Sequence, residues 1–125
     1  MTKAKKAQAP KTRNGGRWTS ARYWSFIRSG LRRMSVRWGP IHDCRKAARR
    51  ASESENKRLK WEYQCALCKG WFKGKDTQVD HIKPTGELRG DRDVERFVRT
   101  LFCELDNLRL LCKNCHEKRK GDDET

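Results

Sequence analysis

Two short stretches, Cys65-Ala-Leu-Cys68 and Cys112-Lys-Asn-Cys115, place the strongest constraint on how this 125-residue chain can fold. Two cysteines separated by two residues can direct both thiolates at one tetrahedral Zn²⁺, and two such pairs complete a four-sulfur site. A site of this kind has no open coordination position. We therefore predict one structural zinc ion, held by Cys65, Cys68, Cys112 and Cys115. The 43 residues between the two pairs exceed a minimal zinc ribbon and indicate a sizeable insertion.

The composition favours a small domain that depends on such a metal. Hydrophobic residues make up 34% of the chain and charged residues 38%, which leaves little material for a large core. Small domains commonly rely on a metal or on disulfides, and zinc can contribute about 10 kcal/mol to folding. Disulfides or redox-active thiol pairs are the alternative for the six cysteines. The first residues contain no apolar run, so we expect a cytoplasmic protein that does not bind membrane.

Positive charge is concentrated in the N-terminal half. The net charge is +15: residues 1–63 carry 18 Lys and Arg against 4 Asp and Glu, or +14, and residues 64–125 carry 13 against 12, or +1. Such an excess favours a polyanion, because binding phosphates releases condensed counterions. An inert, solvated basic tail is the alternative. The candidate nucleic-acid contacts are Arg28, Arg32, Arg33, Arg45, Arg49, Arg50, Lys83, Lys118, Arg119 and Lys120.

The N-terminal half is expected to be an arm followed by helices. The pattern predicts a flexible basic arm at residues 1–17, a helix from Thr19 or Ser20 to about Met34, a helix over residues 41–51 that begins after Pro40, and a polar linker at residues 52–60. We therefore place a domain boundary near residue 58, between a DNA-binding arm that is partly disordered and then helical (1–58) and a compact domain (59–121).

The C-terminal half is expected to consist of short elements around the cysteines. The pattern predicts strands at residues 61–64, 71–72 and 78–79, a helix over residues 94–103 capped by Asp93, a strand at 108–111, and a helix that continues from Cys112 to Lys120. Residues 122–125 form an acidic tail. Cys103 is interpreted as a buried small hydrophobe, and His42 as part of a helix surface.

A set of polar residues accompanies the cysteine pairs in a fixed order. Asp80 and His81 lie in the insertion, Asn107 precedes the last strand, and His116 directly follows Cys115. This order of Cys-x-x-Cys, Asp-His, Asn-Leu and Leu-Cys-x-x-Cys-His resembles the HNH or ββα-metal endonucleases, in the subgroup clamped by a zinc knuckle. The resemblance covers about residues 61–120, and the N-terminal stretch is similar to small phage- or prophage-encoded HNH proteins. It implies a small α+β fold, a zinc-stapled ββα-metal module with a basic helical extension.

The resemblance also implies a role for each polar residue. His81 matches the general base, Asp80 and His116 match the two ligands of a catalytic divalent ion, and Asn107 matches the residue that braces the loop through hydrogen bonds. The ion is Mg²⁺, Mn²⁺, Ni²⁺ or Zn²⁺, and His116 favours the softer ions. The products carry 5′-phosphate and 3′-hydroxyl ends. Because adjacent strand residues point to opposite faces, we expect irregular backbone at Asp80 and His81.

Two alternatives remain beside a DNA endonuclease. One is a non-catalytic zinc module that only binds DNA or RNA, which would not need the Asp80, His81 and His116 set. The other is an accessory phage packaging or recombination factor that acts only with other phage proteins. We expect DNA as the partner, with other phage proteins as further candidates. The chain is expected to be a monomer or a homodimer. One metal site cuts one strand per visit, so a double-strand break would require two subunits or two visits.

Overall fold

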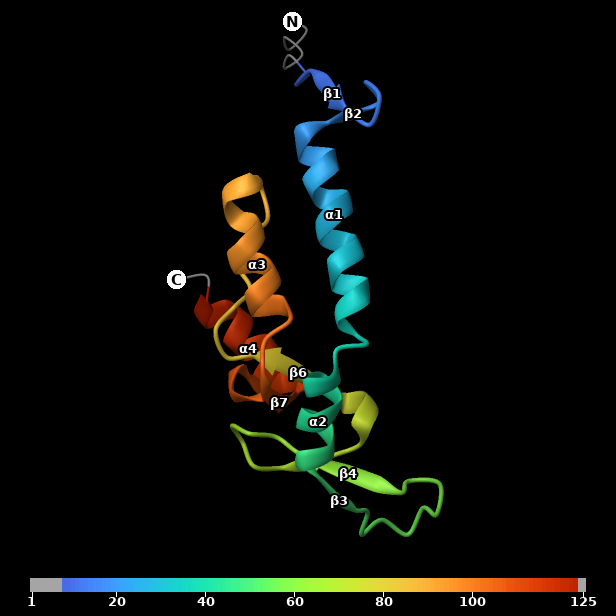
Figure 1. The fold of residues 1–125 in the computed structure, drawn as a ribbon. Helices are drawn as coiled ribbons and strands as arrows, with labels where there is room; N and C mark the ends of the chain where they lie inside the picture. Colours follow the sequence, from blue (N-terminus) through green and yellow to red (C-terminus); the bar gives the residue numbers. More distant parts are fainter. Residues whose placement is uncertain (1–7, 124–125) are drawn as a thin grey trace, which may run out of the picture.

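The fold was analysed in a computed structural model that describes residues 8–123, with side chains as far as Arg119. The predicted small α+β architecture is confirmed. The elements in chain order are β1 (Lys11–Arg13), β2 (Trp18–Thr19), α1 (Ser20–Ser35), α2 (Gly39–Ala47), β3 (Arg49–Ala51), β4 (Trp61–Gln64), β5 (Trp71–Phe72), β6 (Thr77–His81), α3 (Val94–Leu101), β7 (Leu108–Cys112) and α4 (Lys113–Asp123). Figure 1 shows α1 and α3 side by side, with β3, β4, β6 and β7 below them and the β1–β2 hairpin above α1.

A ββα unit built from β6, β7 and α4 positions the polar residues identified above. β6 and β7 are antiparallel, with Thr77 opposite Cys112 and His81 opposite Leu108. β7 runs without a break into α4, so the second cysteine pair occupies the corner between strand and helix. The aliphatic side chains of β7, including Leu108, Leu110 and Leu111, are buried, which secures the strand on the core.

The N-terminal arm is more ordered than the sequence predicts. β1 and β2 form a hairpin whose turn contains Asn14, Gly15 and Gly16, all at positive φ. Glycine and asparagine adopt this conformation at the lowest cost, so the segment that we expected to break structure instead reverses the chain. The helix that follows begins as predicted, because the Thr19 side chain accepts a hydrogen bond from Arg22 N at 3.2 Å. The expected flexibility of residues 1–7 lies outside the described residues.

The second helix is shorter than predicted. α2 ends at Ala47, and residues 49–51 form β3, which pairs antiparallel with β4. β5 pairs with the other edge of β4 and completes a three-stranded sheet. Strand pairing with β4 overrides the helical tendency of these residues.

The two sides of the expected boundary near residue 58 pack together. That boundary falls in the loop that joins β3 to β4, so residues 52–60 connect two paired strands rather than two separate units. Cys44 of α2 is buried in one cluster with Leu108 and Leu110 of β7, and Tyr63 of β4 packs against it. α2 and β3 therefore cover the ββα unit directly.

The core consists of small clusters, as the low apolar content suggests. One cluster joins α1 to α3 through Trp24, Leu88, Phe97 and Leu101. Another contains Leu111 together with Cys65 and Cys112, two of the four cysteines predicted to bind zinc. No helix among residues 8–123 is both long and apolar enough to cross a bilayer.

The helix predicted at 94–103 differs from α3 in its cap and its end. Asp93 occupies the N-cap position of α3, but its side chain makes no capping hydrogen bond: its carboxylate accepts a hydrogen bond from Arg89 N at 3.0 Å and lies 3.5 Å from Arg96. A 3₁₀ turn over Asp91–Asp93 leads into the helix instead. α3 ends at Leu101, and Cys103 packs half-buried against the cluster of Leu108 and Leu110, in keeping with a small hydrophobe.

Candidate functional site

The four predicted cysteine ligands converge on one point. The Sγ atoms of Cys65, Cys68, Cys112 and Cys115 all lie within 4.8 Å of one another, with those of Cys68 and Cys112 at 3.9 Å. Four ligands placed about 2.3 Å from a central Zn²⁺ are separated by about 3.8 Å in a tetrahedron. The donor set and the spacing therefore fit a single zinc ion.

The pKa values of the clustered cysteines also favour a bound cation. Burial raises the pKa of Cys65, but backbone hydrogen bonds around Cys112, Cys68 and Leu67 outweigh this effect and lower the pKa to about 6. Hydrogen bonding with Cys112 and with the other sulfurs raises the pKa of Cys115 to about 12. The neighbouring sulfurs thus resist carrying several negative charges at once, and a bound divalent cation would relieve that repulsion.

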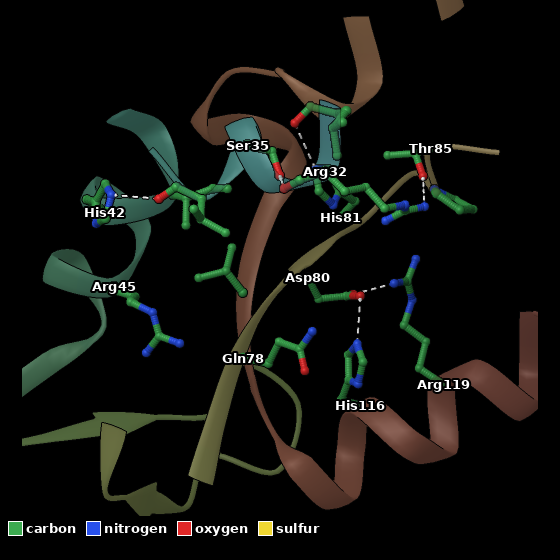
Figure 2. Close-up of a pocket in the computed structure, with 15 residues that line it drawn as sticks. Arg32, Ser35, His42, Arg45, Gln78, Asp80, His81, Thr85, His116 and Arg119 are labelled. Carbon is green, nitrogen blue, oxygen red and sulfur yellow. Dashed lines mark hydrogen bonds and ion pairs between the residues drawn. The ribbon is translucent and has the colours of Figure 1, made fainter. Parts of the chain in front are cut away.

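The carboxylate of Asp80 lies beside three basic side chains. It is 8% exposed, and its Oδ2 accepts a hydrogen bond from Arg109 Nε at 3.2 Å and another from the Arg119 guanidinium. Its Oδ1 lies 3.8 Å from His116 Nε2 (Figure 2). Arg109 is the residue opposite Asp80 on β7, and His116 and Arg119 stand one turn apart on α4.

Asp80 and His116 are close enough to share an ion. Two ligand atoms that each lie about 2.1 Å from one divalent ion are separated by at most about 4.2 Å. The 3.8 Å between Asp80 Oδ1 and His116 Nε2 falls within that limit. Oδ1 is also the carboxylate oxygen that the two arginines do not use. One oxygen and one imidazole nitrogen, both nearly buried, thus form a possible second metal site.

His81 has one ring nitrogen engaged. Its Nε2 lies 3.2 Å from the carbonyl oxygen of Leu101. A carbonyl oxygen only accepts hydrogen bonds, so Nε2 donates and the neutral ring keeps its lone pair on Nδ1. Leu101, the last residue of α3, therefore orients the imidazole and selects its tautomer.

One cavity of about 720 Å³ brings these residues together. Asp80, His81, His116 and Arg119 line it with Arg32 and other residues of α1 and α2. Figure 2 shows Asp80 directed toward α4, while His81 leaves β6 on the side of Ser35 and Arg32. The irregular backbone that we expected is absent: among the described residues, β6 keeps its regular pairing with β7 through Asp80 and His81.

The free edge of β6 explains how both side chains reach one cavity. Within residues 8–123, β6 pairs only with β7, so its other edge borders the cavity. Side chains from both faces of an unpaired edge can line the same space. Asp80 and His81 therefore need no local distortion, although they point in different directions.

Asn107 ties the loop after β6 to the start of β7. Its Oδ1 accepts a hydrogen bond from Lys83 N at 2.8 Å, and its Nδ2 donates to Lys83 O at 3.3 Å. Its backbone carbonyl accepts from Ile82 N at 2.8 Å. These three bonds fix the chain that directly follows His81.

The basic residues predicted in the N-terminal half fall into different settings. Arg32 and Arg45 line the cavity, whereas Arg28 and Arg33 of α1 do not. The guanidinium of Arg49 stacks on Trp61 at 4.0 Å from the ring centroid. That of Arg50 stacks on Trp71 and pairs with Glu62, Nε to Oε1 at 2.5 Å. Arg49 and Arg50 thus contribute to the β3–β4–β5 sheet.

Of the basic residues Lys83, Lys118 and Arg119, whose side chains the structure describes, only Arg119 turns inward. Its guanidinium contacts Asp80 and donates to Ile82 O at 2.6 Å. Lys83 and Lys118 are exposed at the surface. The side chain of Lys120 lies outside the described residues.

Sequence reasoning missed several residues around the cavity. Arg109 gave no signal, because its position opposite Asp80 depends on the register of β6 and β7. Thr77 and Thr85 hold Arg45 and Arg32 through their hydroxyl groups, at 3.1 Å and 3.3 Å. His42, interpreted as helix surface, is exposed but also lines the cavity.

Comparison with known proteins gives one match. The family model described as HNH endonuclease matches residues 65–122, from Cys65 to the end region of α4. Neither a curated protein nor a solved structure matched the chain. The matched segment contains the four cysteines, Asp80, His81, Asn107 and His116.

Proposed function

We propose that this chain, whose residues 65–122 match the HNH endonuclease family model, is a metal-dependent endonuclease that hydrolyses DNA phosphodiester bonds. The observation that carries the proposal is the convergence of Asp80, His81 and His116 on one cavity. These residues are distant in sequence or point in different directions along β6. A zinc module that only binds nucleic acid would not require them to share a cavity with arginines.

His81 is the general base in this proposal. A neutral imidazole can accept a proton from a water molecule and is the most common general base in enzymes. The hydrogen bond from Nε2 to Leu101 O leaves Nδ1 to take the proton of an attacking water. The water oxygen forms a bond to phosphorus, the bond from phosphorus to the 3′-oxygen breaks, and that oxygen takes up a proton. The products are a 5′-phosphate and a 3′-hydroxyl.

Asp80 and His116 are the residues that would hold the catalytic divalent ion. When bound, such an ion stabilises the charge that develops on the phosphoryl oxygens and on the leaving oxygen. The oxygen and nitrogen donors fit Mg²⁺, Mn²⁺, Ni²⁺ or Zn²⁺. The arginines on Oδ2 of Asp80 hold the carboxylate with Oδ1 toward His116.

The remaining residues hold the geometry and bind the substrate. Asn107 fixes the loop after His81 through its hydrogen bonds with Lys83. Arg32 and Arg45 offer guanidinium groups to phosphates that enter the cavity. A structural zinc ion at the four cysteines joins β7 and α4 to the loop after β4 and thereby keeps His116 in position.

The direct test compares two histidines that line the same cavity. Nicking of supercoiled plasmid is measured with Mg²⁺, Mn²⁺ or Ni²⁺ for wild type, His81→Ala and His42→Ala. Loss of the general base should lower the rate about 10²- to 10⁴-fold. His42 is exposed and its Nε2 donates to Val36 O, so His42→Ala should cut at nearly the wild-type rate.

The outcomes separate the endonuclease from its alternatives. Equal cleavage by wild type and His81→Ala would assign the activity to another residue or to a contaminant. Tight plasmid binding without cleavage in any of the ions would favour a non-catalytic nucleic-acid-binding module. Cleavage that appears only after other phage proteins are added would favour the accessory packaging or recombination factor.

A further inference from the structure

We infer that residues 11–35 form a rigid basic rod that contacts duplex DNA on one side of the cleaved phosphate. The rod consists of the β1–β2 hairpin and α1. Its far end would touch DNA about five to eight base pairs from the cut. This inference rests on the proposed function and adds to it the class of substrate, a duplex that extends in one direction.

The hairpin is fastened to α1. Trp18 of β2 packs against Phe26 with ring centroids 4.9 Å apart, and the Arg13 guanidinium stacks on Tyr23 at 4.4 Å. β2 ends at Thr19 and α1 begins at the next residue, with Thr19 as its N-cap. No linker separates the two elements, so the hairpin and the helix should move as one body.

The rod starts at the cavity and leads away from it. Arg32, in the last turn of α1, lines the cavity and donates from Nη2 to the buried hydroxyl of Thr85 at 3.3 Å. Ser20 lies twelve residues earlier, a distance of about 18 Å at 1.5 Å per residue. That length equals about five base pairs of B-DNA at 3.4 Å each. The hairpin occupies the end of α1 farthest from α2 (Figure 1).

The rod is basic along its outer face. Asp43 is the first acidic residue of the chain, so residues 11–35 contain none. Arg22, Ser29 and Arg33 are spaced by seven and four residues and share one face of α1, while Trp24 packs on the core side. Among the described residues, no carboxylate forms an ion pair with any arginine of α1. Small serines between arginines allow a phosphate backbone to approach closely.

The neighbouring helix has the opposite character. α3 runs beside α1 and shares a core cluster with it (Figure 1). Its Arg96 lies 3.5 Å from Asp93, and its Arg99 lies 2.9 Å from Glu95. Carboxylates that neutralise arginines also repel phosphates. The DNA path therefore follows the outer face of α1 and not α3.

The first test measures binding to a duplex of about 20 base pairs in buffer without divalent ions, where no cleavage occurs. Lys11→Gln/Arg17→Gln removes two exposed charges from the hairpin. The slope of log affinity against log salt concentration should decrease by the amount expected for the loss of about two phosphate contacts. The affinity of this variant for DNA should be several-fold weaker than that of wild type. Arg96→Gln/Arg99→Gln removes two charges from α3 and should bind as wild type. Equal losses in both variants, or no loss in the hairpin variant, would overturn the inference.

The second test maps cuts along blunt, end-labelled duplexes of about 30 base pairs in the presence of the active ion. A one-sided rod should leave about five to eight base pairs uncut at the same terminus, 5′ or 3′, of each strand. The hairpin variant should cut closer to that terminus. Cuts that approach both termini equally would contradict the rod while leaving the endonuclease intact. If the binding result holds and neither wild type nor any variant cuts, the endonuclease fails and only the contact between the rod and duplex DNA stands.

Discussion

The arginines on the two walls of the cavity have different kinds of partner. On the wall formed by β6, β7 and α4, Arg109 and Arg119 contact the carboxylate of Asp80. On the wall formed by α1 and α2, Arg32 and Arg45 are held instead by hydroxyl groups, those of Thr85 and Thr77. A carboxylate partner cancels the charge of an arginine, whereas a hydroxyl partner positions the guanidinium and leaves its charge available to a phosphate.

Under the proposed function, this difference implies that DNA cleavage and DNA binding depend on separate groups. The first wall carries the donors for an ion and is nearly neutral overall, and the second wall continues into a helix without acidic residues. Substitutions on the first wall should change cleavage and leave DNA affinity nearly intact. Those on the second wall should do the reverse.

Removal of zinc should have the largest effect, because it disrupts both walls. Cys112→Ser, or a strong chelator applied to wild type, should abolish zinc binding. The fold would then lose the contribution of about 10 kcal/mol that zinc makes to folding. Cys112 is buried at the junction of β7 and α4, so the helix that carries His116 should detach. Zinc content by mass spectrometry and helicity by circular dichroism measure the result.

Cys103→Ser is the matched control for that experiment. Cys103 is half-buried, lies outside the four-sulfur cluster, and has a pKa raised chiefly by burial. The variant should retain one zinc ion per chain. A Cys112→Ser protein with full zinc and native helicity would show that the cluster does not staple the fold.

Asp80→Asn should have the next largest effect, confined to the first wall. The amide removes a ligand for the divalent ion and the charge that holds Arg119, so cleavage should fall by about 10²-fold or more. DNA affinity in buffer without added divalent ions should stay the same or rise, because a negative charge near the phosphates has gone. Plasmid nicking and fluorescence anisotropy test the two halves of this expectation. A parallel loss of cleavage and affinity would disprove the separation of the walls.

Arg32→Gln/Arg45→Gln should produce a smaller effect, confined to the second wall. DNA affinity should fall about tenfold. The slope of log affinity against log salt concentration should decrease by the amount expected for the loss of about two phosphate contacts. Arg50→Gln is the control, because Arg50 already pairs with Glu62 at 2.5 Å. Binding isotherms at several salt concentrations provide the measurement. Similar slopes for all three proteins would show that these arginines do not reach DNA.

Thr85→Val should have the smallest effect and tests the hydroxyl itself. Valine keeps the buried volume but removes the acceptor that holds Arg32. Loss of one hydrogen bond to a charged group corresponds to roughly 1 kcal/mol, so DNA affinity should fall about fivefold. Zinc content and thermal stability should change little. Unaltered affinity would mean that Arg32 is positioned by its packing over Phe97 alone, at 5.6 Å from the ring centroid.

The sequence was most informative where a local pattern carries its own geometry. The two Cys-x-x-Cys pairs predicted the four-sulfur cluster, and the threonine at position 19 predicted the start of α1. The order of Asp80, Asn107 and His116 around the second cysteine pair predicted the family. In each case the information lies within a few residues of chain or in a motif that tolerates few arrangements.

The sequence was least informative where a residue depends on a distant partner. Residues 49–51 continue a helical pattern, and only pairing with β4 makes them a strand. Arg109 meets Asp80 through strand register, and Arg32 reaches the cavity because α1 packs on α3. The Asn14-Gly15-Gly16 turn had a hairpin signal, but its flanking residues do not alternate between apolar and polar, so the two strands were missed.

The packing of α2 onto β7 determines where a fragment must begin if the proposed nuclease module is to be transplanted into another protein. A fragment that begins at residue 59 would uncover Leu108 and Leu110 where Cys44 now lies, and it would leave β4 without its partner β3. A chimaera that joins this module to a foreign DNA-recognition domain should therefore begin no later than Gly39. In such a fusion, α2 and the β3–β4 hairpin would travel with the proposed catalytic residues, and the segment that replaces the proposed basic rod would have to cover Phe97 and Leu101 where Trp24 now packs.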